Sequence, residues 1–371
     1  MARDKRADDA ADRDARNGRA TGRSKSRGPG VRRMIAAAAF MPLAGRAPLY
    51  ARFLWSLITD DRTPATRKAL LAGSTNMWLR ERATKAAFVR RSVSRFMPGE
   101  TMDDALRAAG DLKTERITTI LTRLGENITR IEEAEEVTQH YFEVLDKVAA
   151  AGLDAHVSVK PTQLGLDQDL DVCRKNLDRL IERTEQRNNF LWIDMESSHY
   201  VEPTLDLFRY ARARTRRIGI ALQAYLYRTK KDVESLVALG CAIRIVKGAY
   251  LEPAEVAYPK KSDVDENFFK LCTRLMEPDA LAAGCLLHIA THDMPLVERL
   301  GAWIAEHKVP ASAYEYAMLY GIQRGHQQRL AREGKRLRVL ISYGEYWFPW
   351  YMRRLAERPA NVWFVVRTMF G

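Results

Sequence analysis

Charged and polar side chains recur in this 371-residue sequence at the points where short apolar runs end. Lys160 ends the run AHVSVK, Asp194 follows FLWI, and Lys247 follows AIRIV. Similar endings place Glu126, Glu196, Gln223, Tyr250, Thr291, His292 and Tyr343. If the runs are parallel strands, their carboxyl ends lie together, and in a closed barrel they form the rim that carries chemistry. The pattern therefore predicts one polar site assembled from many separate segments.

Two of these residues, Lys160 and Lys247, allow two kinds of chemistry. A lysine at a strand end can bind an anionic group, or it can form a Schiff base with a carbonyl substrate once desolvation lowers its pKa. Each could instead pair with a carboxylate such as Glu196 or Asp194 for structure alone. The residue types by themselves leave these alternatives open.

Arg353 and Arg354 are adjacent on a predicted helix that contains Glu357 and is stopped by Pro359. Neighbouring helix positions point about 100° apart, so two guanidinium groups converge only on a small anion such as a carboxylate or phosphate. The alternative is a solvated pair in which Arg354 bonds a carboxylate.

Metal and dinucleotide motifs are absent from the sequence. His288 and His292 are four residues apart, but the run reads as a strand and position 289 is Ile, so the H-E-x-x-H pattern fails. We expect His292 at the rim and His288 buried nearer the base, and we predict no metal site. There is no G-x-G-x-x-G and no P-loop motif, so a bound dinucleotide would not be held by either turn.

The elements that must position these residues alternate between strand and helix. Eight β-rich runs are read at Ile117–Glu126, Ala155–Lys160, Phe190–Glu196, Ile218–Tyr225, Ala242–Tyr250, Leu286–His292, Ala313–Leu319 and Arg338–Gly344. The segments between them, such as Val172 to Arg187 and Asp232 to Leu239, read as amphipathic helices. Eight strand–helix repeats predict an α/β fold, a closed (β/α)₈ TIM-type barrel, with an open sheet as the alternative.

The amino-terminal third differs from the rest in composition and in its hydrophobic pattern. Residues 1–33 hold eleven Lys or Arg and five Asp, a net of +6 of the chain's +13, and predict a disordered basic tail. Residues 34–116 read as a helical segment, and the barrel domain is expected over residues 117–371. The apolar run Met34 to Ala44 is shorter than the roughly 18–20 residues of a spanning helix. We expect a cytoplasmic protein whose tail could attract it to an anionic membrane surface, with an export signal as the alternative.

Several strand-end strings carry a family resemblance. The strings are SVKPTQLGL, WIDMESSHYVEPTLDL, ALQAYLYRT, IRIVKGAYLEP, IATHD, YEYAMLYGI and RRLAERPANVWF. In unbroken order over about residues 120–365, they resemble the proline dehydrogenase family, flavin enzymes that oxidise L-proline. The chain resembles the stand-alone bacterial form, because no room is left for the aldehyde dehydrogenase half of the fused proteins.

The resemblance implies a distorted barrel with non-covalent FAD lying across the rim. Lys160, Arg353 and Arg354 would hold the proline carboxylate, and Asp194 and Arg244 would be the active-site pair near the flavin. Residues that would contact FAD are Met195, Gln223, Lys247, Gly248, Ala249, Thr291 and His292, with Glu357 at the adenosine end. Tyr250 and Leu319 would line the pocket around the substrate ring. Glu126 would be the glutamate that closes a lid by bonding one arginine of the pair Arg353 and Arg354. The product would be Δ1-pyrroline-5-carboxylate, and a membrane quinone would accept the electrons.

Two departures from the family pattern touch the expected substrate pocket. Leu340 stands where proline-oxidising members commonly have Tyr in the eighth strand, and Trp350 stands where Tyr is common before the arginine pair. Hydroxyproline or another cyclic or N-alkyl amino acid is therefore the alternative substrate. A Schiff-base aldolase on the same barrel is a more distant alternative. Nucleic-acid binding is not expected, because the basic tail has no aromatic residue for stacking.

Overall fold

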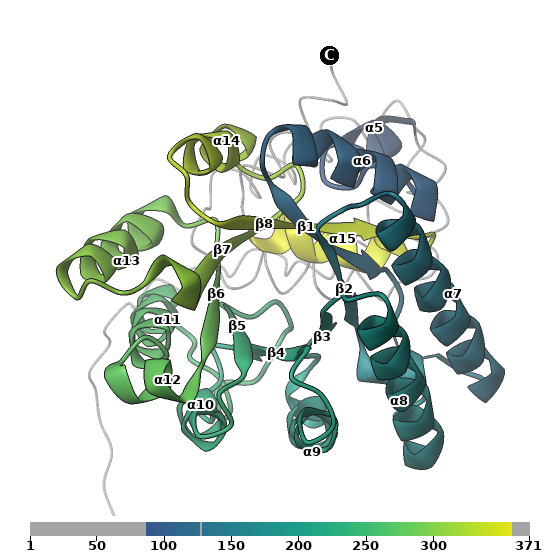
Figure 1. Ribbon diagram of the computed structural model, residues 1–371, viewed down its shortest axis with the longest axis horizontal. Coiled ribbons are helices and arrows are strands. Elements are labelled where there is room, and N and C mark those ends of the chain that lie inside the picture. The colour runs from purple at the N-terminus through teal and green to yellow at the C-terminus, as the bar shows by residue number, and fades with distance from the viewer. Residues whose placement is uncertain (1–86, 127, 358–371) are drawn as a thin grey trace, which may run out of the picture. The chain divides into compact units, whose positions relative to one another are not determined.

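Eight parallel strands close into a barrel (Figure 1). The computed structural model describes residues 87–126 and 128–357, so the predicted basic tail 1–33 lies outside the described residues. The strands are β1 Thr118–Arg123, β2 Ala155–Val159, β3 Leu191–Ile193, β4 Ile218–Gln223, β5 Ala242–Val246, β6 Leu286–Ala290, β7 Tyr314–Leu319 and β8 Leu337–Tyr343. Because β8 pairs with β1 in parallel, the predicted barrel is confirmed and the open-sheet alternative is wrong.

Most strands end one to four residues before the polar residue that closed the predicted run. The run expected to reach Tyr250 ends as a strand at Val246. Gly248 has a φ of +116°, which an extended strand does not allow, so the chain has already left the sheet. Most of these polar residues therefore lie in the loops that follow the strands, whereas Gln223 and Tyr343 are the last residues of β4 and β8.

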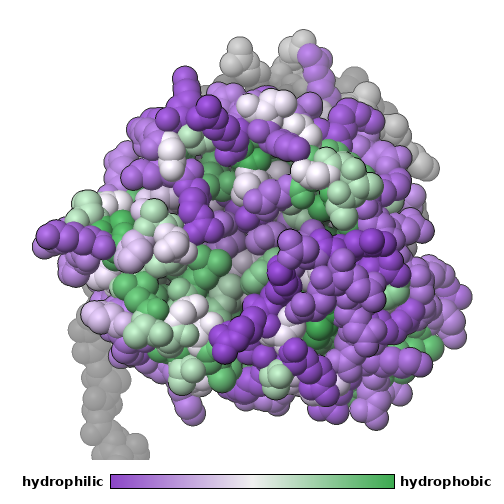
Figure 2. Space-filling model, viewed as in Figure 1, coloured by the Kyte–Doolittle hydropathy of each residue, from purple (hydrophilic) through white to green (hydrophobic). Residues whose placement is uncertain are grey.

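Helices cover the outside of the strands. They are α7 Ile131–Ala150, α8 Leu170–Gln186, α9 Val201–Arg212, α10 Thr229–Val237, α11 Lys261–Arg274, α12 Pro278–Ala283, α13 Met294–Glu306 and α14 Arg324–Arg332, with short 3₁₀ turns η1 Pro161–Leu164, η2 Ser198–Tyr200 and η3 Ala311–Ala313. In α8 the carboxylate of Asp169 caps the amino end, and residues at three- and four-residue spacing, such as Leu177 and Leu180, are buried. Hydrophilic side chains cover the outward faces of α7 and α8 (Figure 2).

Within residues 87–126 and 128–357, two helices precede the barrel and one crosses its end. After α5 (Ala87–Val93), α6 (Met102–Thr114) packs against β1 and β8, where the last helix of a regular barrel would lie. The helix after β8, α15 (Trp347–Glu357), instead runs across the end of the barrel (Figure 1). There Arg353 reaches Glu126, which follows β1. This arrangement places the arginine pair at the carboxyl ends of the strands.

The barrel interior is apolar at one level and charged at the base. Ile120, Trp192 and Ala242 form a buried cluster inside the strands, and Leu340 packs against it. The predicted burial of His288, in the middle of β6, is confirmed: no part of it is exposed, and its Nε2 lies 3.3 Å from Oε2 of Glu315, which is near the amino end of β7. Complete burial lowers the pKa of His288 well below its usual range.

None of the helices in the described part of the chain combines the length and the hydropathy that a membrane span requires.

Candidate active site

Asp194 and Arg244 meet inside the mouth of the barrel. Asp194 follows β3, Arg244 lies on β5, and the Nη2 of Arg244 donates a hydrogen bond to Asp194 Oδ1. Ser158 on β2 joins them, since its Oγ donates to Asp194 Oδ1 at 2.8 Å and accepts from Arg244 Nη2 at 3.2 Å. Only 3% of the Arg244 surface is exposed. The structure thus brings together the pair that the sequence predicted and adds a bridging hydroxyl.

Trp192 supports Arg244 from below. The guanidinium carbon of Arg244 lies 5.0 Å from the centre of the Trp192 ring, within cation–π range. The indole Nε1 donates to His156 Nδ1 at 3.2 Å, and the ring packs 4.3 Å from that of His288. Burial lowers the pKa of Arg244 from its ordinary value, and the carboxylate of Asp194 opposes this effect. An always-charged group is therefore held in the interior by one carboxylate and one aromatic face.

Lys160 lies beside the same carboxylate. Its Nζ is 3.7 Å from Asp194 Oδ2, and 8% of the residue is exposed. Burial opposes the charge of this ammonium group, but the carboxylates of Asp194, Glu126 and Glu196 outweigh it, so the pKa of Lys160 is raised. A protonated lysine binds anions and is a poor nucleophile. The environment of Lys160 therefore favours anion binding over Schiff-base chemistry.

Arg353 pairs with Glu126 across the mouth. Its Nη2 donates to Oε1 at 2.6 Å and its Nη1 to Oε2 at 3.3 Å, a two-point contact between α15 and the end of β1. Tyr250 adds a hydrogen bond from its hydroxyl to the same Oε1 at 3.2 Å, and its ring lies 5.2 Å from the Arg353 guanidinium carbon. This three-residue contact joins segments that are more than 100 residues apart in the chain.

Arg354 lies inward on the same helix. It is 9% exposed, and its guanidinium carbon is 5.8 Å from the centre of the Trp350 ring. The alternative of a solvated arginine pair is wrong, because the Arg353 side chain is only 13% exposed as well. Glu357 is the last residue of α15, and its side chain lies outside the described part of the chain.

Lys247 is enclosed by carboxylates. Its Nζ donates to Asp265 on α11 and, at 2.7 Å, to Asp293 before α13. Lys261 bonds the same two carboxylates. The structure thus gives Lys247 an ion-pair network, and its predicted contact with FAD stays a prediction.

A glycine is required at position 248 both by a neighbouring side chain and by the backbone conformation. A Cβ added to this residue would lie 2.2 Å from the ring of Tyr225, and its φ of +116° already disfavours a side chain. The family resemblance placed Gly248 among the residues that would contact FAD. The packing of Tyr225 accounts for this glycine without a cofactor.

The remaining predicted residues lie at or just after the carboxyl ends of several strands. They are Met195 after β3, Gln223 at the end of β4, Ala249 after β5, Thr291 and His292 after β6, and Leu319 at the end of β7. His292 Nε2 accepts a hydrogen bond from the backbone of Leu319 at 2.8 Å, which fixes the orientation of its ring. The Oε1 of Gln223 is buried without a hydrogen-bond partner among the described residues, and so is the Nη1 of Arg244. An acceptor and a donor are therefore available in the interior.

Sequence reasoning missed Ser158 and Trp192 as parts of this site. Side chains on a strand alternate between two faces, so Ser158 shares the face of Lys160, and Trp192 shares the face of Asp194. That period of two was the available signal. Neither residue stands at the polar end of a run, where most of the other candidates lie.

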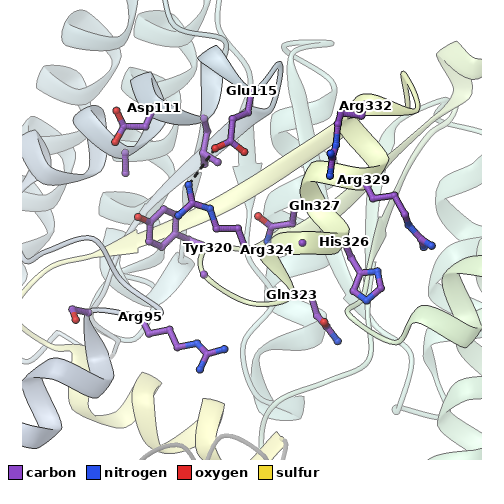
Figure 3. A pocket seen from close by; sticks show the side chains of 15 residues that line it. Arg95, Asp111, Glu115, Tyr320, Gln323, Arg324, His326, Gln327, Arg329 and Arg332 are labelled. Atoms are coloured by element: carbon purple, nitrogen blue, oxygen red, sulfur yellow. Dashed lines mark hydrogen bonds and ion pairs between the residues drawn. The ribbon is translucent and has the colours of Figure 1, made fainter. Parts of the chain in front are cut away.

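A separate polar cavity of about 960 Å³ lies between α6 and α14 (Figure 3). Its lining includes Arg95, Glu115, Arg324 and Arg329, and it contains none of the predicted site residues. Arg324 donates to Glu115 at 3.2 Å, so part of its charge is neutralised inside the cavity wall. This cavity is distinct from the cluster at the barrel mouth.

Comparison with known sequences relates the chain to one enzyme family. A sequence model of the family described as Proline dehydrogenase matches residues 105–367. The chain is 35% identical over 280 residues to Proline dehydrogenase 2 of Bacillus subtilis (strain 168), covering 76% of this chain and 91% of that protein. It is 37% identical over 280 residues to Proline dehydrogenase of Deinococcus radiodurans, covering 74% and 89%.

Comparison with solved structures supports the same fold. The chain is similar to proline utilization A from Bdellovibrio bacteriovorus, inactivated by N-propargylglycine, with a TM-score of 0.70 and 21% identity. The match covers 89% of this chain and 41% of that protein. Proline utilization A from Corynebacterium freiburgense matches with a TM-score of 0.63 over 81% of this chain and 34% of that one. This chain thus spans less than half of either structure.

Proposed function

The chain belongs to the proline dehydrogenase family, and we propose that it oxidises L-proline to Δ1-pyrroline-5-carboxylate with bound FAD and passes the electrons to a membrane quinone. The family model spans most of the barrel, and relatives at 35% identity extend over three quarters of the chain. The observation that carries the proposal is the gathering of Lys160, Asp194 and Arg244 at the mouth that Arg353 spans.

Fixed cations suit an amino-acid substrate. Lys160 stays protonated beside Asp194, and Arg353 offers a two-point donor that now bonds Glu126. The substrate carboxylate would bind between Lys160 and the arginine pair, with Arg354 completing the clamp. Charge-assisted bonds from three directions would fix the ring in one orientation, which lowers the entropic cost of reaction.

The residues at the mouth fit a flavin. A buried donor or acceptor left without a partner costs about 1–3 kcal/mol, and Arg244 Nη1 and Gln223 Oε1 are two such atoms. An isoalloxazine edge offers both acceptors and donors, so it could satisfy both. FAD, when bound, would supply the hydride acceptor at N5. The residues that would hold it are Met195, Gln223, Arg244, Lys247, Gly248, Ala249, Thr291 and His292, with Glu357 at the adenosine end.

Protein groups would set the electrostatics of this step. The Arg244 cation, held by Asp194 and Ser158, would stabilise negative charge that develops beside it. Asp194 also keeps Lys160 charged. Apolar and aromatic walls from Tyr250, Leu319, Leu340 and Trp350 would exclude water from the substrate ring.

Leu340 favours proline over hydroxyproline. It packs against Ile120 and Trp192 in the interior and carries no hydrogen-bonding group. A hydroxyl placed against it would be buried without a partner, which a site discriminates against strongly. Hydroxyproline and N-alkyl amino acids are therefore the weaker candidates.

The aldolase alternative has little support. The raised pKa of Lys160 disfavours a neutral amine, and Lys247 is bonded by Asp265 and Asp293. Neither lysine is a free nucleophile. A covalent adduct trapped by borohydride in the presence of a carbonyl substrate would be the evidence for an aldolase.

The visible spectrum of the purified protein tests the proposal. We expect flavin absorbance bands, and anaerobic addition of L-proline should bleach them faster than hydroxyproline or pipecolate at equal concentration. A colourless protein after reconstitution with FAD, or one that proline does not bleach, would refute it. Activity with quinone-loaded anionic vesicles, before and after deletion of residues 1–33, tests the acceptor and a role of the tail in peripheral membrane binding.

A further inference from the structure

Glu196 is a buried carboxylate at the mouth that the proposed chemistry does not use. It follows Asp194 by two residues, and only 2% of its surface is exposed. Its Oε1 accepts from the hydroxyl of Thr162 at 2.7 Å, and its Oε2 accepts from the backbone N–H of Thr162 at 3.2 Å. Glu196 thus joins the loop after β3 to the turn η1.

The turn η1 carries Lys160 at its start. Lys160 directly precedes the first residue of η1, so the position of this turn determines where the ammonium group lies. On the other side, Gln163 Nε2 donates to the carbonyls of Arg123 and Gly125 at 3.1 and 2.9 Å. The turn is therefore held by two contacts, one from Gln163 to the end of β1 and one from Thr162 to Glu196 after β3. The contact with Glu196 is the charged one.

The groups that face Glu196 come from several elements. Besides Thr162, its electrostatic neighbours are Lys160 at the start of η1, Glu126 after β1, Tyr250 after β5 and Cys173 on α8. Lys160 is the cation of this set. Burial raises the pKa of Glu196 to about 7, against the opposing effect of the Thr162 hydrogen bond. This carboxyl group therefore changes charge near neutral pH.

We propose that Glu196 is a positioning residue for Lys160, holding the turn that carries it and setting by its own charge how strongly Lys160 attracts an anion. The inference rests on the proposed function, in which Lys160 binds the substrate carboxylate. When Glu196 is protonated, the positive charge of Lys160 is less compensated and an anionic ligand binds more tightly. When Glu196 ionises, it weakens that attraction.

Cyclopentanecarboxylate is a suitable probe, because it has the ring and the carboxylate of proline but no amine that titrates. Its dissociation constant for the purified flavoprotein is measured by calorimetry from pH 6 to 8.5. We expect the wild-type constant to rise about tenfold over this range, which corresponds to a displacement of one pKa unit on binding. In Glu196→Gln this rise should be lost.

Variants of Thr162 separate the electrostatic role from simple loss of structure. Thr162→Val removes a hydrogen bond that stabilises the ionised carboxylate, so the midpoint of the binding profile should move to higher pH. Thr162→Ser keeps the hydroxyl and should restore the wild-type midpoint. Thr204→Val is the matched control, because Thr204 is a fully buried threonine on α9 whose hydroxyl has no partner among the described residues.

An unchanged pH step in Glu196→Gln, or an unmoved midpoint in Thr162→Val, would overturn the proposal. If Glu196→Gln does not fold, the Thr162 variants decide the matter. Reduction of the flavin by proline is followed separately with the wild type. Probe binding with the expected pH step but no oxidation of proline would refute the proposed function alone, whereas a wild type that oxidises proline but binds the probe without a pH step, or not at all, would refute this inference alone.

Discussion

The guanidinium group of Arg244 lies over the indole ring of Trp192, with the guanidinium carbon 5.0 Å from the ring centre. The ring is fully buried and is itself held by a hydrogen bond to His156. Arg244 therefore has a carboxylate beside it and an aromatic face below it. The position of the Arg244 cation in the mouth therefore depends on Trp192, which is bonded to His156 on β2.

Replacing Trp192 should reduce flavin reduction by proline. In Trp192→Leu the cation–π contact and the indole hydrogen bond are lost, and we expect kcat to fall about tenfold, the equivalent of about 1.4 kcal/mol. Trp192→Phe keeps an aromatic face and should retain most of the rate. Stopped-flow bleaching of the flavin measures both variants, and equal rates for Leu and Phe would show that the aromatic face has no role.

Replacing Arg353 should affect substrate binding more than the chemical step. Arg353→Met removes the two-point donor that bonds Glu126 and is proposed to bind the substrate carboxylate. Loss of a charge-assisted contact of this kind is worth about 1.5–3 kcal/mol, so KM for proline should rise at least tenfold with a smaller change in kcat. Arg324→Met, on α14 away from the mouth, is the control. A fall in kcat with constant KM would contradict the binding role.

Introducing a hydroxyl at Leu340 should shift substrate preference. Leu340→Thr places a hydrogen-bonding group in the interior, so the ratio of kcat/KM for hydroxyproline to that for proline should rise about tenfold. Ile341 is on the same strand, but its side chain belongs to the large apolar cluster that includes the helices around the barrel. Ile341→Thr should therefore lower stability without changing the ratio of the two kcat/KM values. The two substrates are compared in dye-coupled assays, and a constant ratio in Leu340→Thr would place Leu340 outside the substrate pocket.

Ionisation of Glu196 should lower stability as pH rises. Its pKa is raised to about 7 in the folded protein from an ordinary value of 4.5, so the folded state holds the proton more tightly than the unfolded state. The associated stabilisation is complete below pH 4.5 and is lost as pH rises toward 7, amounting to about 3 kcal/mol for a buried group. Glu196→Gln should lack this component.

Urea unfolding of the wild type and of Glu196→Gln at pH 5 and pH 8 measures this effect. The difference in unfolding free energy between the two proteins should change by up to about 3 kcal/mol between these pH values, in favour of the variant at pH 8. Groups that titrate equally in both proteins cancel in this comparison. A constant difference would show that Glu196 keeps an ordinary pKa.

Much of the architecture was predictable from local pattern. Apolar runs of strand length alternated with amphipathic segments, and each predicted run overlaps one of the eight strands, although β8 begins one residue earlier, at Leu337. The pairing of Asp194 with Arg244 was implied by the family resemblance, and the structure brings the two side chains together. The predicted runs extended too far because polar residues after a strand, such as Lys247, look like its last residues until a neighbour such as Gly248 turns the chain.

The sequence by itself determined which segments become strands and which polar residues reach the mouth, because side-chain alternation and the apolar content of a run are local properties. Only the tertiary structure decided that α15 crosses the barrel end, that Lys247 lies between Asp265 and Asp293, and that Glu196 is buried beside Lys160. These features arise from burial and charge summed over segments far apart in the chain. No window of neighbouring residues contains that information.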